Sequence, residues 1–99
     1  MTRPATHPGE VLSEELETLG ITATELARQL GVPANRITQI VQGKRSVTGD
    51  TALRLGHWFG MNPQFWLNLQ SAFDLWQARE AAGAEIAALP TRAALQPAG

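Results

Sequence analysis

Residues 22–45 read TATELARQLGVPANRITQIVQGKR, and this is the most informative stretch of the sequence. Thr22 and Glu25 have the spacing of a capping box, in which the threonine hydroxyl accepts a hydrogen bond from the backbone N–H three residues on and the glutamate reaches back. Gly31 ends this short helix, and Pro33 suits the first turn of a second one. A linker this short predicts two helices that cross at a steep angle.

The two short helices share an apolar wedge. Ala27 is a small residue placed where the helices approach most closely, and Gly43 ends the second helix. Large apolar side chains at helical spacing fill the space between the helices; they are Leu26, Leu30, Val32, Ile37 and Ile40. Once these inward positions are removed, the second helix keeps a polar face that holds no acidic residue.

This polar face has the chemistry to read base edges in the major groove of DNA. Asn35 and Gln39 can pair bidentately with adenine, and Arg36 can pair with guanine. Ala34 and the methyl group of Thr38 can contact the methyl group of thymine. We therefore predict that these five residues contact bases. The alternative interpretation is an ordinary solvated helix surface.

Groups at both ends of the motif are suited to DNA phosphates. The backbone N–H groups that open the first helix form an anion site, and two cations follow directly after the second helix. The predicted phosphate contacts are Thr22, Ala23, Thr24, Gln42, Lys44 and Arg45. The alternative for Lys44 and Arg45 is a solvated pair in a loop.

A further helical pattern precedes the motif. It begins near Pro8, stops at Gly20, and carries a predicted apolar stripe at Leu12, Leu16 and Leu19. Its four acids form either a solubilising face or a surface for a basic partner; they are Glu10, Glu14, Glu15 and Glu17.

Two more helices are predicted after the motif. Thr48 caps the fourth helix and Gly60 stops it. Its expected apolar side consists of Leu53, Leu55, Trp58 and Phe59. Asn62 and Pro63 open a long fifth helix that ends between residues 82 and 89.

The fifth helix carries an apolar stripe made of Phe65, Trp66, Leu69, Phe73 and Trp76. Part of the stripe is expected in the core. Because a domain this small hardly needs so many aromatic side chains inside, we predict that the stripe also forms a two-fold dimer contact. Residues 1–82 are thus expected to form the helix-turn-helix domain with a C-terminal dimerisation helix. Residues 83–99 are expected to form an Ala- and Pro-rich tail that is mobile at its end.

The net charge of −1 hides an uneven distribution of charge. Residues 10–25 hold five acids and no base, whereas residues 28–54 hold five bases against Asp50 alone. Near-neutrality therefore does not exclude nucleic acid.

Other functions find no support in the sequence. The chain has no cysteine, which excludes disulfides and thiolate metal sites. It has no apolar run that could span a membrane, so a cytoplasmic protein is expected. His57 has no partner at metal-ligand spacing and is expected to be structural. No acid is paired with a histidine or a nucleophile, so we expect neither an enzyme nor a cofactor.

The motif resembles the helix-turn-helix of the XRE family, also called Cro/C1-like. Ala27, Gly31, Ile37 and Ile40 match the small, turn and buried positions of that family. Over residues 7–80 the chain is more closely similar to the HigA-type antitoxins. The blocks that match are HPGE at 7–10, NRIT at 35–38, GKR at 43–45, DTALRL at 50–55 and FWLNLQ at 65–70.

The resemblance implies an all-α, five-helix lambda-repressor-like DNA-binding domain with a long fifth helix. It also implies a homodimer that binds an operator in double-stranded DNA, represses its own operon and neutralises a HigB-like toxin, a RelE-like mRNA endonuclease. Asn35, Arg36 and Gln39 would enter the major groove foremost. The alternative is a stand-alone XRE-family transcriptional regulator with no toxin partner.

Overall fold

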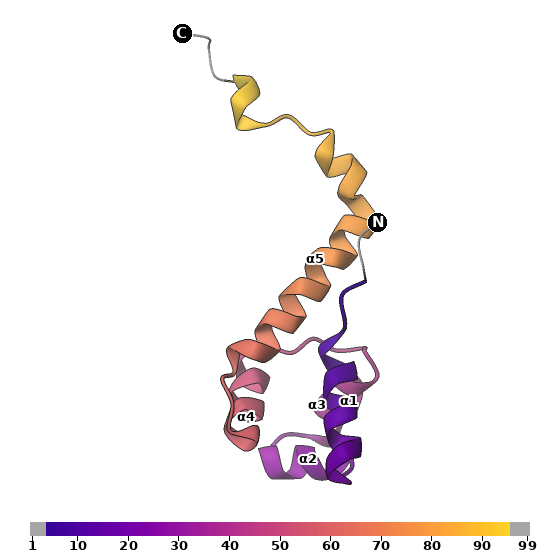
Figure 1. Cartoon of the computed structure of the whole chain (residues 1–99), viewed down its shortest axis with the longest axis vertical. Helices are drawn as coiled ribbons and strands as arrows, with labels where there is room; N and C mark the ends of the chain where they lie inside the picture. The colour runs from indigo at the N-terminus through magenta and orange to yellow at the C-terminus, as the bar shows by residue number, and fades with distance from the viewer. Residues whose placement is uncertain (1–3, 96–99) are drawn as a thin grey trace.

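The computed structural model describes residues 4–95, which form α-helices, one short 3-10 helix and the turns between them. The helices are α1 (Pro8–Leu19), α2 (Ala23–Leu30), α3 (Ala34–Val41), α4 (Gly49–Phe59), α5 (Gln64–Ala87) and the 3-10 helix η1 (Arg92–Leu95). Helices α1 to α4, here called the head, cluster together, and α5 starts beside α4 and rises away from them (Figure 1). The predicted all-α fold with a long fifth helix is confirmed.

Side chains cap α1, α2 and α4, whereas α3 begins after Pro33 without a side-chain cap. The Thr22 hydroxyl accepts from the N–H of Glu25 at 3.1 Å, as predicted. The reciprocal half of the capping box is absent, because the Glu25 carboxylate accepts instead from Arg28 and Gln29. His7, to which the sequence assigned no role, caps α1: its Nδ1 accepts from the N–H of Gly9 at 2.8 Å.

The core lies between the helices of the head and the start of α5. Its buried apolar residues are Leu12, Leu16, Leu26, Ala27, Leu30, Ile37, Ile40, Val47, Ala52, Leu55 and Trp66. The predicted wedge between α2 and α3 is confirmed, with Val32 half-buried against it. The packing of its apolar side in this core therefore fixes the orientation of α3.

Two residues of the predicted apolar stripes lie outside this core. Leu19 is 50% exposed, because the left-handed turn at Gly20 brings Ile21 back against the core in its place. Leu53 is 65% exposed, because Ala52 and Leu55 define the inward side of α4 and Leu53 lies off that side. Both expectations were wrong.

Glycines allow two close backbone contacts. A Cβ on Gly9 would lie 1.8 Å from the backbone oxygen of Ile40, so the start of α1 packs directly on the end of α3. A Cβ on Gly56 would lie 2.8 Å from the backbone oxygen of Met61. Glycine lowers the helix propensity of α4 at this position, but the absence of a side chain leaves room for the tight turn from α4 into α5.

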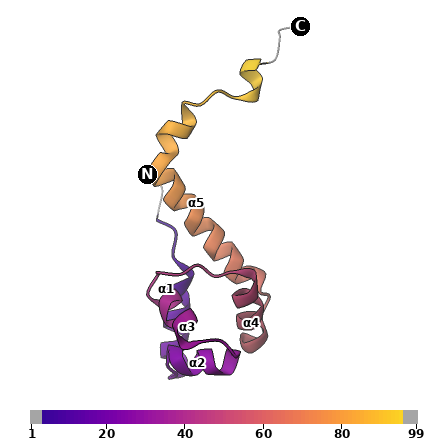
Figure 2. The ribbon, with the colours of Figure 1, turned by 180° about the vertical axis from the view of Figure 1, so that it is seen from behind.

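Helix α5 leaves the head along most of its length, as the view from behind also shows (Figure 2). Only Trp66 and Gln70 of its residues are buried. The principal extents of the molecule, 62 × 25 × 21 Å, reflect this projection. The helix ends at Ala87, so it continues into the segment 83–99 that the sequence set apart as a tail. Of the end expected to be mobile, residues 96–99 lie outside the described part of the chain.

Candidate nucleic-acid interface

The side of α3 that faces away from the core is the first component of the candidate site. Ile37 and Ile40 are fully buried, which fixes the rotation of the helix. Ala34 and Asn35 are then exposed, and Thr38 and Gln39 are half-buried. The structure therefore places these four predicted base-contacting residues on a helix whose orientation the core determines.

The loop after α3 folds back onto the end of that helix. Gly43 adopts a φ of 76°, and the N–H of Lys44 donates to the backbone oxygen of Gln39 at 2.8 Å. Arg45 Nε donates to Gln39 Oε1 at 3.0 Å. Gln42, Lys44 and Arg45 are exposed. The two predicted phosphate-binding cations thus lie directly beside a predicted base-reading amide.

Gln70 of α5 fixes this loop from the other side. Its buried Oε1 accepts from the N–H of Val47 at 2.8 Å, and its Nε2 donates to Asp74 Oδ1 at 2.9 Å. Sequence reasoning missed this residue, although an amide beside the aromatic stripe of the fifth helix was the available signal. Gln70 is therefore a positioning residue for the loop that carries Lys44 and Arg45.

The start of α2 holds the remaining predicted phosphate contacts. Thr22 and Thr24 are exposed and Ala23 is half-buried. Glu25 lies in the same turn, where its hydrogen bonds to Arg28 and then Gln29 lower its pKa to about 2. The carboxylate next to the helix N-terminus thus stays charged and paired with Arg28 of its own helix.

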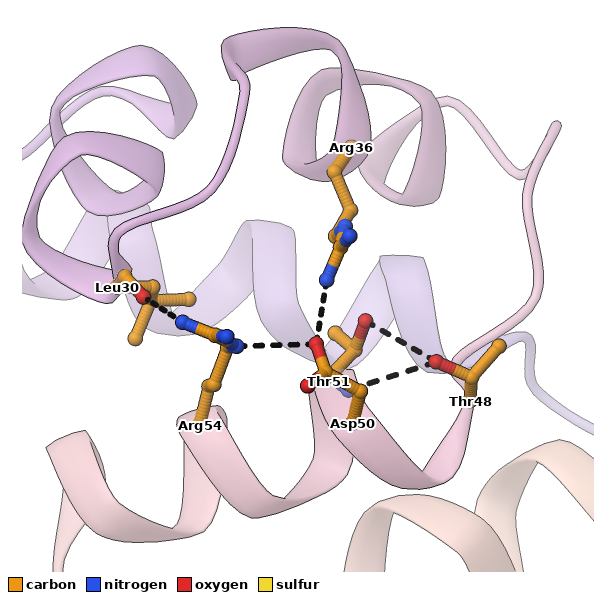
Figure 3. Close-up of polar contacts among 6 residues, drawn as sticks. All are labelled: Leu30, Arg36, Thr48, Asp50, Thr51 and Arg54. Atoms are coloured by element: carbon orange, nitrogen blue, oxygen red, sulfur yellow. Dashed lines mark hydrogen bonds and ion pairs between the residues drawn. The ribbon is translucent and has the colours of Figure 1, made fainter.

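Arg36 differs from its neighbours on α3 because its side chain turns toward α4 (Figure 3). Its Nη1 lies 2.5 Å from Asp50 Oδ2, and the same oxygen accepts from Arg54 Nε at 2.9 Å. Arg54 Nη1 also donates to the backbone oxygen of Leu30, the last residue of α2, at 2.8 Å. The hydrogen bonds from Arg54 and then Arg36 hold the pKa of Asp50 below its usual range. This ion-pair cluster joins α2, α3 and α4.

The predicted dimer stripe divides between the core and the surface. Trp66 is 1% exposed and belongs to the core of the single chain, so its assignment to a dimer interface is corrected. Its bulk fills the space between α5 and the head, with the Phe59 ring 5.8 Å away. Phe65 is 41% exposed, whereas Leu69, Phe73 and Trp76 are half-buried. These four residues remain accessible in part.

The acidic side chains of α1 are accessible as well. Glu10, Glu14, Glu15 and Glu17 are all exposed, and within residues 4–95 none of them forms an ion pair. Over the same part of the chain, no helix combines the length and apolar character that crossing a membrane requires.

Comparisons with known proteins agree with this geometry. The helix-turn-helix family matches residues 12–66. Virulence-associated protein I of Dichelobacter nodosus is 50% identical over 78 residues, which cover 78% of this chain and 72% of the relative.

Solved structures of antitoxins are similar over nearly the whole chain. One, from Coxiella burnetii, is described as an addiction module antidote protein of a HigA family; it superposes with a TM-score of 0.86 at 49% identity. A second, Pseudomonas aeruginosa antitoxin HigA with the higBA promoter, has a TM-score of 0.86 at 41% identity. Each match covers 91% of this chain and 98% of the other. The chain therefore belongs to the helix-turn-helix family and, within it, to the HigA-type antitoxins.

Proposed function

We propose that this antitoxin represses its own operon by placing α3 in the major groove of an operator. Membership in the family makes the chain a DNA-binding protein and not an enzyme. The observation that carries the proposal is the orientation of α3, because its buried isoleucines leave an acid-free side outward, next to Lys44 and Arg45. The promoter DNA in the structure of the Pseudomonas relative supports the same use of this surface.

The proposed contacts divide into two kinds. Ala34, Asn35, Thr38 and Gln39 contact base edges and supply sequence preference. The start of α2 and the loop after α3 contact phosphates, and those contacts supply affinity that depends on salt. A two-fold dimer would read two half-sites about one helical turn, roughly 34 Å, apart.

Affinity measurements on the DNA upstream of the gene test this division. Gln39→Ala is expected to reduce the preference for operator over scrambled DNA, because a bidentate base contact is worth roughly 1–3 kcal/mol. Lys44→Ala is expected to weaken binding to both DNAs and to reduce the slope of log affinity against log salt by about 1. Identical behaviour of the two variants would refute the division. A wild-type protein with no sequence preference would refute operator binding.

We propose that the accessible part of the aromatic stripe on α5 forms the dimer contact. Phe65, Leu69, Phe73 and Trp76 retain exposed surface, and the helix that carries them projects from the head. Sedimentation at micromolar concentration is expected to give a dimer for the wild type and a larger monomer fraction for Phe65→Ala. A strictly monomeric wild type, with and without DNA, would contradict the dimer.

We propose that the acidic side of α1 binds a basic toxin. Its four glutamates are exposed, form no ion pair within residues 4–95, and precede the basic residues 28–54 in the sequence. Co-purification with the product of the adjacent gene is expected, and Glu14→Lys with Glu17→Lys is expected to weaken the complex. If no complex forms, the chain acts as a stand-alone transcriptional regulator, which is the second candidate function.

A further inference from the structure

The Arg36–Asp50–Arg54 cluster stands where the DNA-facing side of α3 meets α4. The Arg36 side chain is 30% exposed, whereas Asp50 is 55% exposed, so the arginine is the more enclosed partner. A hollow beside it is lined by Arg45, Ser46, Thr48 and Thr51. Arg36 thus leaves the reading side of its own helix and lies against the first turn of another.

We propose that Asp50 is a specificity-determining residue for DNA binding, because it holds Arg36 against α4 and leaves base reading to the uncharged side chains of α3. The inference rests on the proposed operator binding. It replaces the role in base contact that the sequence predicted for Arg36.

The cluster has the means to hold Arg36 in place. An isolated exposed ion pair contributes little, about 0–1 kcal/mol, but networks with good geometry hold their members better. Here Asp50 is fixed by Arg54, and Arg54 is itself fixed by the backbone oxygen of Leu30. The carboxylate therefore cannot follow Arg36 outward without breaking a second contact.

If Arg36 were released from Asp50, it would lower the preference of the protein for the operator over other DNA. Its guanidinium would bind phosphates, which every DNA presents at the same spacing whatever the sequence. One added phosphate contact is worth on the order of tenfold in affinity at 0.1 M salt. On the operator, the base contacts fix the register of α3 and limit which phosphate Arg36 can reach. On other DNA, no base contact fixes the position of α3, so the protein can move along the duplex until Arg36 reaches a phosphate.

Four proteins test the inference: the wild type, Asp50→Asn, Arg36→Gln and the double variant. Fluorescence anisotropy gives Kd for the operator and for a scrambled duplex of equal length over a range of salt concentrations. Asp50→Asn keeps the size of the side chain and removes its charge. Glu85→Gln near the end of α5 makes the same change in net charge away from the cluster and serves as the matched control.

We expect Asp50→Asn to bind scrambled DNA on the order of tenfold more tightly, with a salt slope steeper by about 1. Its preference for the operator should fall accordingly. Arg36→Gln should keep the operator affinity within about threefold, because the arginine is not a reader. The double variant should regain the wild-type preference, and Glu85→Gln should retain it throughout.

Three results would overturn the inference. These are an unchanged preference in Asp50→Asn, a loss of operator affinity beyond tenfold in Arg36→Gln, or a double variant that stays as indiscriminate as Asp50→Asn. The second result would mean that Arg36 leaves Asp50 and reads the operator. Thermal unfolding measurements check that each variant is folded. If Asp50→Asn fails to fold, the operator affinity of Arg36→Gln alone tests the inference. A wild type without preference would refute operator binding itself, and the inference with it.

Discussion

Helices α3 and α5 use the same kind of structure in opposite ways. Helix α3 has 8 residues, too few to be stable alone in water, and it depends on its two buried isoleucines and on α2. Helix α5 has 24 residues, and beyond Gln70 none of the residues described is buried. The short helix is therefore held rigidly by its neighbours, as reading DNA requires, whereas the far half of the long helix is free for contact with another molecule.

The largest effect is expected where α5 still belongs to the core. Trp66→Ala should lower the free energy of unfolding by about 3–5 kcal/mol, because it removes a fully buried aromatic side chain. Ile86→Ala, at a half-exposed position near the end of the same helix, should change it by less than about 0.5 kcal/mol. Urea unfolding measures both values, and similar losses would contradict the division of α5 into two parts.

Two glycines test the same contrast between the packed head and the projecting part of α5. Gly9→Ala should lower the free energy of unfolding by about 1–3 kcal/mol, because its Cβ would overlap the backbone oxygen of Ile40 and push α1 from α3. Gly83→Ala, where the nearest atom would be 3.7 Å away, should instead raise the helicity of α5 through a propensity gain of about 1 kcal/mol. Thermal melts and far-UV circular dichroism measure the two effects. A stable Gly9→Ala protein would refute the close contact.

Loss of the hydrogen bond that links Gln70 of α5 to the loop after α3 should have an intermediate effect. Gln70→Ala leaves the buried N–H of Val47 without its acceptor, at a cost of about 1–3 kcal/mol. It should also weaken operator binding, because the loop with Lys44 and Arg45 is no longer fixed. Gln64→Ala, exposed at the start of the same helix with its side chain bonded to Asn68 of that helix, is the control. A loss of stability with unchanged DNA affinity would show that the loop does not need Gln70.

The smallest effect on stability is expected from lowering the pH, through the ionisation of Glu25. The pKa of Glu25 is about 2 in the folded protein against 4.5 for an unperturbed glutamate, owing to Arg28 and then Gln29. The folded state therefore binds fewer protons, and this stabilisation is complete above pH 4.5 and lost as the pH falls toward 2. The Tm difference between wild type and Glu25→Gln should be positive at pH 6 and vanish near pH 2. A Tm difference that stays constant from pH 6 to pH 2 would contradict the stabilising pair with Arg28.

Much of the head was predictable because its signals are local. Thr22 and Thr48 cap helices, glycines end them, and the apolar spacing of α2 and α3 identifies the wedge. The exposures of Leu19 and Leu53 were not predictable from spacing. A helical stripe predicts which side of a helix is apolar, but the neighbouring elements determine how much of that side is buried.

Local patterns were enough to predict the five helices, the helix-turn-helix and the polar character of α3, since capping and 3.6-residue periodicity act within a few residues. Tertiary packing was needed to show that Trp66 fills the core, that Gln70 anchors Val47, and that Arg36 turns to Asp50 and not outward. The two hydrogen bonds, Arg36 to Asp50 and Val47 to Gln70, join residues 14 and 23 positions apart, a separation that no local pattern encodes. Long-range packing therefore selects which of the chemically suitable side chains of α3 point away from the protein.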